Sequence, residues 1–301
     1  MTTSSSHIDE YDQSKYWAAP ARNFRSSARL HLQHLLVQNT LGYLLEPTIE
    51  KSVANANAKP LKIADLACGN GIWLTELHSH LASNNIPAQL DGFDINPIYF
   101  PDAAYRPPTV TLKKLDILAK PLPIELIGVY DVVHIRALGS VIPTADLSPV
   151  LTVVFELLKP GGYIQWDESR GDRFIVESPS PQIPKVHCDT LVHVLKAGLQ
   201  AKGIVSDWVD VLDTHLDKFG FQNVQQHIQQ KRKQDFKGWT EDYLMVWEEL
   251  ATLFPPKSKA PKALMSREEW IDLFSKAVGE TEQGVVVHQG TVVTAIGQKP
   301  T

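Results

Sequence analysis

The stretch KIADLACGNGIWLTEL, residues 62–77, decides how this chain folds. The apolar run from Leu61 to Leu66 predicts a short parallel strand that is buried on both faces. Gly69 and Gly71 then allow a tight turn and a close approach of the backbone to a ligand. A helix expected from Ile72 to about Leu81 points its free N–H groups back at that turn. The stretch therefore predicts a site for a nucleoside-bearing cofactor.

The spacing of the glycines indicates which class of cofactor the turn would bind. A dinucleotide-binding turn reads G-x-G-x-x-G, and here the position of the third glycine is Leu74. This departure weakens the interpretation as a nicotinamide-dependent oxidoreductase. Ordinary packing of a helix on a strand also uses glycines at such bends, so the stretch alone does not decide the function.

Acidic residues also end the next two expected strands. Leu90–Ile95 contains Asp94, and Val110–Ile117 contains Asp116. A carboxylate at the end of a second strand can accept hydrogen bonds from both ribose hydroxyls. A single acid of this kind is commonly only a solvated strand end. Together with Asp65, however, three successive strand ends carry an acid, which favours a binding edge.

The rest of the chain predicts further sheet and helix elements. A helix is expected from roughly Phe24 to Leu45, with an apolar stripe that includes Leu35 and Leu36. A fourth strand is expected over Val129–Ile135 and a fifth over Tyr163–Trp166. The other expected elements are a helix capped by Ser148, a lid helix with Val186 and Leu199, a sixth strand over Phe219–Ile228, a helix capped by Ser266 and Glu269, and a last strand over Gly284–Ile296.

The small residues Ala67, Gly69 and Gly71 after Asp65 resemble the first motif of class I S-adenosylmethionine (SAM) methyltransferases. Ala67 stands where most members carry glycine. The run LLKPGGYIQWDE resembles the segment that joins their fourth helix and fifth strand, so the resemblance spans about residues 61–168. More narrowly, LGYLLEPTI, LDGFDIN and YDVVHIRALGSVI are similar to fungal methyltransferases of secondary metabolism, which act on nitrogen or oxygen of peptide-like or polyketide scaffolds.

The resemblance implies a Rossmann-like α/β fold with strand order 3-2-1-4-5-7-6 and an antiparallel last strand. Residues 1–20 would be a flexible N-terminus, and residues 21–60 a helical cover over the cofactor with a linker. Residues 61–301 would be the methyltransferase domain, with helical insertions at about 171–205 and 236–281 that act as a lid.

The resemblance also implies SAM as the cofactor and a set of residues that contact it. Asp94 would hold the ribose, Asp116 would accept from the adenine amino group, and the Ile117 N–H would face the ring. Arg29 on the N-terminal helix is a further residue that could reach the cofactor. The expected contact set is Tyr16, Asp65, Ala67, Cys68, Gly69, Gly71, Asp94, Ile95, Asp116, Ile117, His134 and Arg136.

Catalysis requires little beyond alignment, because the methyl group of a sulfonium is already activated. A proton must still leave an alcohol, phenol or amide acceptor, and His134 has an ordinary pKa suited to a general base. A structural histidine beside the cofactor is the alternative. Asp167 and Glu168 follow the fifth strand and are further candidates, but adjacent strand residues face opposite sides, so we expect only one of them to point inward.

The composition limits the kinds of partner and ligand that this chain is expected to bind. The net charge of −5 and the isolated basic run Lys231–Lys233 disfavour nucleic acid. Cys68 and Cys188 supply neither a disulfide framework nor a zinc set, and the pair His31 and His34 has no third ligand, so we expect no metal. No apolar run could span a membrane or serve as a signal peptide, which favours a soluble, cytoplasmic protein.

The expected acceptor is a small, largely apolar molecule, and the sequence leaves a homodimer open. A second hypothesis is a SAM-binding regulatory or interaction protein that transfers no methyl group, since no catalytic residue is compelled by a motif. An NAD(P)-dependent oxidoreductase is a third.

Overall fold

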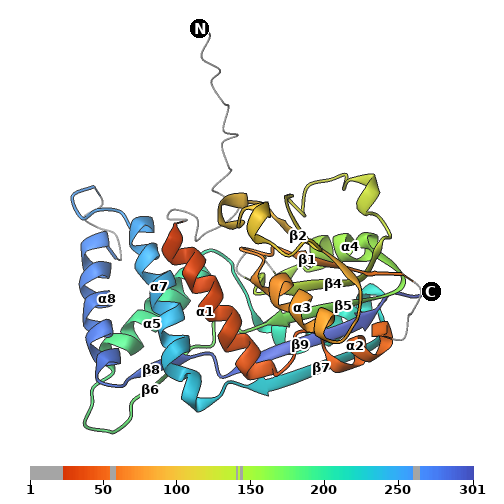
Figure 1. The fold of residues 1–301 in the computed structure, drawn as a ribbon. Coiled ribbons are helices and arrows are strands. Elements are labelled where there is room, and N and C mark those ends of the chain that lie inside the picture. Colours follow the sequence, from red (N-terminus) through yellow and green to blue (C-terminus); the bar gives the residue numbers. More distant parts are fainter. Residues whose placement is uncertain (1–22, 55–58, 140–141, 143–144, 260–264) are drawn as a thin grey trace.

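A seven-stranded sheet forms one half of the molecule and a group of helices forms the other (Figure 1). The computed structural model describes residues 23–54, 59–139, 142, 145–259 and 265–301. In spatial order the strands are β3 (Val110–Lys114), β2 (Ala88–Asp94), β1 (Leu61–Leu66), β4 (Tyr130–Arg136), β5 (Leu158–Glu168), β9 (Thr291–Gln298) and β7 (Gln222–Gln230).

The pairing of these strands confirms the predicted fold class. The pairs β3-β2, β2-β1, β1-β4 and β4-β5 are parallel. Strand β9 is antiparallel to both of its neighbours, β5 and β7. When β7 and β9 are counted as the sixth and seventh strands of the sheet, the order is 3-2-1-4-5-7-6 with the last strand antiparallel.

Two apolar layers explain why the central strands are apolar at almost every position. Helices α2 (Pro47–Ala54) and α3 (Ile72–Ser83) contribute to one layer, together with Ile63 of β1 and Val132 of β4. Helices α4 (Ser148–Leu157) and α6 (Leu212–Phe219) contribute to the other, with Ala64 and Val133. Successive strand residues point to opposite faces, so a strand covered on both sides must be apolar throughout.

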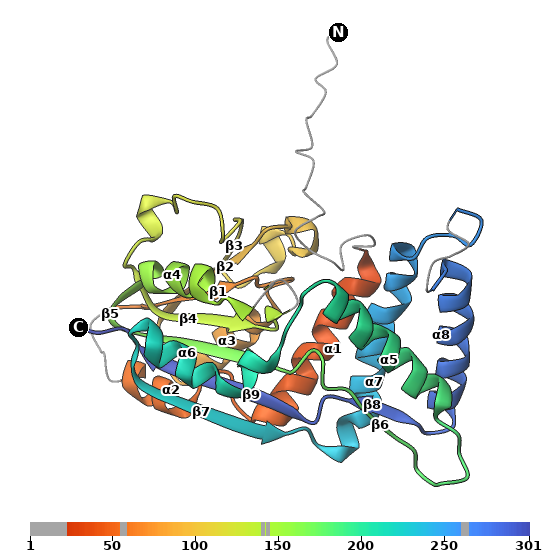
Figure 2. The same cartoon turned by 180° about the vertical axis from the view of Figure 1, so that it is seen from behind.

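The second half of the molecule, the helical module, consists of α1 (Phe24–Leu41), α5 (Val186–Ala201), α7 (Phe236–Glu249) and α8 (Arg267–Glu282) (Figure 2). A small antiparallel sheet of β6 (Ile175–Glu177) and β8 (Val286–His288) belongs to it. Its core holds the aromatic side chains that the sequence spaced along helices, namely Trp239, Tyr243, Trp247 and Trp270. These rings pack in an apolar cluster of their own, separate from the two layers on the sheet.

Several predicted boundaries were wrong. The N-terminal helix ends at Leu41 rather than Leu45, because Gly42 takes a left-handed C-cap conformation with φ of 78°. Leu35, expected on its apolar stripe, is 55% exposed, whereas Leu36 is buried. Ser148 is the first residue of α4 instead of its cap, and its N–H is accepted by Asp146.

Other boundaries moved for similar local reasons. The expected last strand is two strands, because Gly290 turns the chain at a φ of 79° between β8 and β9. The sixth strand begins at Gln222. Strand β3 ends at Lys114, so Asp116 lies in the turn that follows it. The capping box of Ser266 and Glu269 is confirmed, with hydrogen bonds in both directions.

The predicted flexible N-terminus, residues 1–20, and the expected contact Tyr16 lie outside the described residues. None of the helices in the described part of the chain has the length and apolar character that crossing a bilayer requires.

Candidate functional site

The glycine turn after β1 has the backbone that its sequence predicts. Ala67, Gly69 and Gly71 all have positive φ, at 56°, 58° and 75°. A Cβ at Gly71 would lie 2.8 Å from the Leu112 side chain, so the turn has no room for a larger residue there. Ala67 is the exception, since it holds a left-handed conformation that ordinarily favours glycine.

The contact between α3 and β2 explains why Leu74 stands where a dinucleotide turn has glycine. A Cβ on Gly92 of β2 would lie only 2.8 Å from a Leu74 methyl group. The glycine that permits close packing of helix on strand is therefore on the strand, and the leucine on the helix is fully buried against it. In a dinucleotide fingerprint, by contrast, the third glycine on the helix permits this close packing of helix and strand.

Helix α1 lies directly on the glycine turn. The Asn70 side chain donates to the Ser27 carbonyl at 3.3 Å and lies 3.0 Å from the His31 ring nitrogen. Leu30 is so close that a Cβ on Gly69 would meet it at 3.0 Å. The N-terminal helix thus packs on the glycine turn, and its Arg29 pairs with Asp242 of α7.

The strand-end acids Asp94 and Asp116 lie on adjacent strand ends. Asp94 accepts hydrogen bonds from the backbone N–H groups of Gly69 and Asn96, each at 2.9 Å. Its own carbonyl accepts from the Leu115 N–H at 2.9 Å, which brings Asp116 to the same edge. Asp116 in turn accepts from the Leu118 N–H. Of the apolar residues expected beside them, Ile95 and Cys68 are partly buried and Ile117 is buried.

The side chain of Asp65, which the sequence predicts as a cofactor contact, pairs with another protein side chain in this structure. Its side chain is 4% exposed and accepts a 2.7 Å hydrogen bond from Nδ1 of His134, its register partner on β4. The carboxylate is directed along the sheet at a neighbouring strand, so its partner is a protein side chain.

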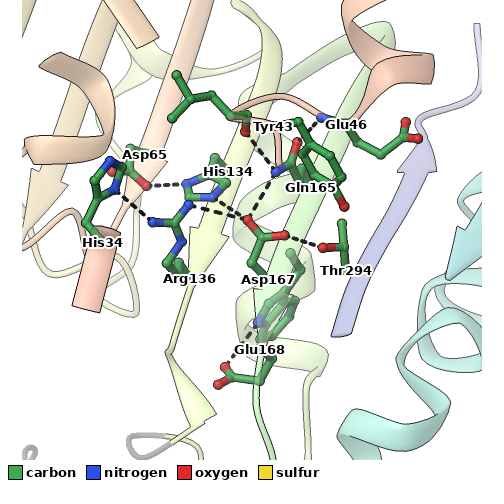
Figure 3. A network of polar contacts seen from close by, with 12 residues as sticks. His34, Tyr43, Glu46, Asp65, His134, Arg136, Gln165, Asp167, Glu168 and Thr294 are labelled. Atoms are coloured by element: carbon green, nitrogen blue, oxygen red, sulfur yellow. Dashed lines mark hydrogen bonds and ion pairs between the residues drawn. The ribbon is translucent and has the colours of Figure 1, made fainter. Parts of the chain in front are cut away.

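His134 is the centre of a buried charged network (Figure 3). Besides Asp65, its ring contacts Asp167 through Nε2 at 3.1 Å, and it stacks on Trp73 with ring centroids 3.7 Å apart. Burial lowers the pKa of His134, but the Asp65 charge and the hydrogen bonds that the ring donates to both carboxylates outweigh it, so the pKa is raised. Both nitrogens are occupied, and neither is available in this arrangement to take a proton from an acceptor.

Asp167 completes this network and is held from several sides. Its Oδ1 accepts from Thr294 at 2.6 Å, and its Oδ2 accepts from Gln165 at 3.1 Å (Figure 3). Burial raises its pKa, but the bonds and charges of His134, with Arg136, outweigh that effect and lower it. A carboxylate that is 1% exposed and has this many partners is suited to a structural role.

Glu168 faces the opposite side of β5, as the alternation of strand residues predicts. Its carboxylate accepts from the N–H groups of Gly139 and Ser169, at 2.9 and 3.1 Å, and from the Trp166 indole at 3.4 Å. Burial raises its pKa to about 7 despite these bonds. Glu168 therefore ties the turn after β4 to the end of β5.

Arg136 ends β4 beside α1, with hydrogen-bond donors to spare. Its Nη1 contacts Nδ1 of His34 at 3.1 Å, and its Nη2 lies 3.7 Å from Asp167. Burial and the Arg136 charge lower the pKa of His34 to about 3, so His34 is a neutral acceptor. Within the described part of the chain, Nε and Nη2 of Arg136 have no hydrogen-bond partner.

Sequence reasoning missed the residues that support this network. Trp73, Gln165 and Thr294 lie on three different elements, and no local pattern marks them. His34 was weighed only as a metal ligand, and the described residues contain no cluster of metal-binding side chains.

Comparison with known proteins identifies the family. A model described as a methyltransferase domain matches residues 63–162, which include the glycine turn and the strand-end acids. The methyltransferase grgD of a Penicillium species is 34% identical over 200 residues, 65% of this chain and 65% of that protein. Residues 63–162 are therefore a methyltransferase domain, and the chain resembles the class I SAM-dependent methyltransferases.

Other relatives match a smaller share of this chain. The N-methyltransferase verN of Clonostachys rogersoniana is 30% identical over 54% of each chain. The secondary metabolism regulator LAE1 of Hypocrea atroviridis is 35% identical over 35% of this chain and 28% of its own. The matches thus span less than two thirds of each relative. A solved Haemonchus contortus phosphoethanolamine N-methyltransferase 2 in complex with SAM aligns at 12% identity over 84% of this chain and 52% of that one, with a TM-score of 0.45, and adds nothing to the assignment.

SAM is the cofactor of this family, and the residues at the ligand edge fit it. Arg136 has buried guanidinium N–H groups without partners, which suit a carboxylate. Asp94 and Asp116 are acceptors of the kind that hydroxyl and amino groups require. The glycine turn permits a close approach of the backbone.

Proposed function

We propose that this protein transfers a methyl group from SAM to nitrogen or oxygen of a small, largely apolar secondary metabolite. The observation that supports the proposal is the ligand edge: the glycine turn holds Asp94 through the Gly69 N–H, and α1 contacts both this turn at Asn70 and Arg136 at the end of β4. The fungal relatives named methyltransferase grgD and N-methyltransferase verN support the reaction class.

Bound SAM supplies a methyl group on a positively charged sulfur. The chain's own residues bind and orient it: carboxylates accept from the nucleoside, and Arg136 faces an anionic end. Helix α1, which packs on the turn through Asn70 and Leu30, excludes water from that side. The network of Asp65, His134 and Asp167 fixes the ends of β1, β4 and β5, so the edge is held rigid.

We also propose that the helical segments at about 171–205 and 236–281 are insertions that form the acceptor side. Helices α5, α7 and α8 from these segments pack with α1 in the helical module. Because α1 contacts the glycine turn as well, an acceptor held by the module would be close to the cofactor.

A regulator that binds SAM without methyl transfer is the second candidate, and the match to the LAE1 regulator favours it. The two functions share the cofactor and differ in turnover. They are separated by whether a labelled methyl group ever leaves SAM for a small molecule.

The test begins with calorimetric titration of the full chain with SAM, S-adenosylhomocysteine and NADPH. We expect the first two to bind and NADPH not to bind. Asp94→Asn should weaken SAM binding tenfold or more, whereas Asp102→Ala, which removes an exposed helix cap, should leave it unchanged. Binding of NADPH alone would refute the proposal.

Turnover is then measured with methyl-labelled SAM and a panel of apolar phenols, amines and cyclic dipeptides. Label in an extracted product supports the enzyme. Tight SAM binding without label in any product favours the regulator.

A further inference from the structure

Helices α1 and α7 run antiparallel and are joined by polar contacts at both ends. Near one end, Ser26 donates to Glu249 at 2.5 Å, and near the other, Asn39 donates to Asp235 at 3.4 Å. Between them, Leu36 packs so tightly on Gly238 that a Cβ there would lie 2.9 Å from it. The two helices are therefore held together near both ends and at Gly238.

Asp242 lies in the middle of this contact with its carboxylate unsatisfied. Its side chain is 1% exposed, and Nη1 of Arg29 is 3.6 Å from Oδ1, which is an ion pair but not a hydrogen bond. Among the residues that the structure describes, neither carboxylate oxygen has a hydrogen-bond donor within 3.5 Å, and Nε of Arg29 has no acceptor. Gln33 and Arg29 of α1 favour the ionised form of Asp242 from a longer range. A buried carboxylate in this state is costly, which favours a role in binding.

An aromatic face and a second cation lie next to it. Nζ of Lys231 is 3.5 Å from the centroid of Trp239 and is fixed by hydrogen bonds to Tyr243 and Gln289, at 2.8 and 3.2 Å. The Lys231 charge acts on both Asp242 and Glu168. The indole Nε1 of Trp239 also has no acceptor among the described residues.

We propose that Arg29, Lys231, Trp239 and Asp242, the α1–α7 subsite, hold the methyl acceptor, and that Asp242 accepts a hydrogen bond from a neutral hydroxyl or N–H group on its ring. This rests on the proposed function and names its substrate class. The hydrogen-bond donor on the acceptor is neutral because two cations, Arg29 and Lys231, already lie near the Asp242 carboxylate. An ammonium group on the acceptor would be repelled by them. The ring of the acceptor would pack against the aromatic side chain of Trp239.

The first test uses the wild-type chain saturated with S-adenosylhomocysteine and two matched probes, 2-naphthol and 2-methoxynaphthalene. The two probes have the same ring system, and only the first can donate a hydrogen bond. We expect 2-naphthol to bind at least tenfold more tightly by calorimetry, because the unsatisfied carboxylate gains a donor only from it. Equal affinities, or no binding of either probe, would overturn the inference.

The second test uses Asp242→Asn with Asp235→Asn as its matched control on the same helix. Both variants should retain their affinity for S-adenosylhomocysteine and their circular dichroism spectrum. Only Asp242→Asn should reduce the preference for 2-naphthol, to threefold or less. An unchanged preference would refute the role of Asp242.

A pH series in the wild type supplies the test if Asp242→Asn does not fold. Burial raises the pKa of Asp242 to about 6, opposed by Arg29 from α1 and by Lys231 after β7. The preference for 2-naphthol should therefore fall as the pH drops below about 6, where the acid becomes neutral. A preference for 2-naphthol that stays unchanged from pH 8 to pH 4 would contradict the assignment to Asp242.

These tests separate a failure of the proposed function from a failure of the subsite alone. No binding of S-adenosylhomocysteine would refute both the proposed function and the subsite. Normal binding of it with no preference between the probes would refute the subsite alone.

Discussion

Replacing Glu168 by Gln should reverse its effect on stability between acid and alkaline pH. The Glu168 side chain is 6% exposed at the end of β5, and its three hydrogen-bond donors are the Gly139 and Ser169 N–H groups and the Trp166 indole. Burial raises its pKa from 4.5 to about 7. The folded protein therefore favours the neutral acid more than the unfolded chain does.

The sign and size of the effect follow from this shift. The contribution of Glu168 to the free energy of unfolding is full below pH 4.5 and is lost as the pH rises through about 7. A shift of about 2.5 units at 1.36 kcal/mol per unit gives a loss of about 3 kcal/mol by pH 8. Gln cannot ionise and avoids this loss, but it has only one accepting oxygen, which costs about 1 kcal/mol. Glu168→Gln should thus be less stable by about 1 kcal/mol near pH 4, nearly as stable as the wild type at pH 5, and more stable by about 2 kcal/mol at pH 8.

Urea unfolding followed by tryptophan fluorescence measures this, because the chain contains seven tryptophans. Free energies of unfolding are compared at pH 4, 5, 6, 7 and 8 for the wild type, Glu168→Gln and Glu125→Gln. Glu125 is exposed, so the control should differ from the wild type by less than about 0.5 kcal/mol at every pH. If the Glu168→Gln and wild-type curves stay parallel across this range, the reasoning from burial is wrong.

Three further substitutions test individual features of the fold. Ala67→Gly should raise the free energy of unfolding by about 0.5–1 kcal/mol, because Ala67 has a φ of 56°; an unchanged or lower thermal midpoint would show that this turn is not strained. His134→Phe keeps a ring on Trp73 but leaves Asp65 and Asp167 without their shared donor, so we expect a loss of about 3 kcal/mol or more in urea unfolding. A loss under about 1 kcal/mol would mean that the two carboxylates find other donors. Ser266→Ala removes one half of the capping box of α8 and should cost about 1 kcal/mol, whereas Ser266→Thr should cost much less, and equal losses would contradict the capping role.

The fold was predictable because its signals are local. Strands β1 and β4 are covered on both faces and each contains a short apolar run, which indicates a buried parallel strand. The glycine turn requires positive φ, and Gly69 and Gly71 supply it. Boundaries were less predictable where one residue decides them, as Gly42 does for α1.

The roles of the acids were not predictable, because they depend on strand register. Asp65 and Asp94 both end a parallel strand and are alike in sequence. The neighbour of Asp65 on β4 is His134, whereas the neighbour of Asp94 on β3 is Lys114. Register is a property of two strands together, so the sequence of one strand could not separate the structural acid from the ligand-edge acid.

Contacts between distant segments were also beyond the sequence. The sequence left open whether Arg29 reaches the cofactor or packs within the protein, and in the structure it pairs with Asp242, which lies more than two hundred residues away. Alternation along β5 predicted that Asp167 and Glu168 face opposite sides. It could not show that Thr294 of β9 holds one and Gly139 the other.

The charged network also explains how α1 can lie on a strand edge that carries so many acids. With His134 protonated, Asp65 and Asp167 are balanced by His134 and Arg136, so the buried charge under α1 sums to zero. Because the folded pKa of His134 is raised, this balance contributes stability that is complete below about pH 6.5 and is lost as the pH rises through the folded value.

Helix α1 contacts this charged network through His34, which stays neutral and accepts a hydrogen bond from Arg136. The same helix contacts the glycine turn through His31 and α7 through Arg29. A displacement of α1 would therefore alter the cofactor edge and the α1–α7 subsite together. Helix α1 would thus line both of the proposed sites, so that a single movement of this helix would open both of them.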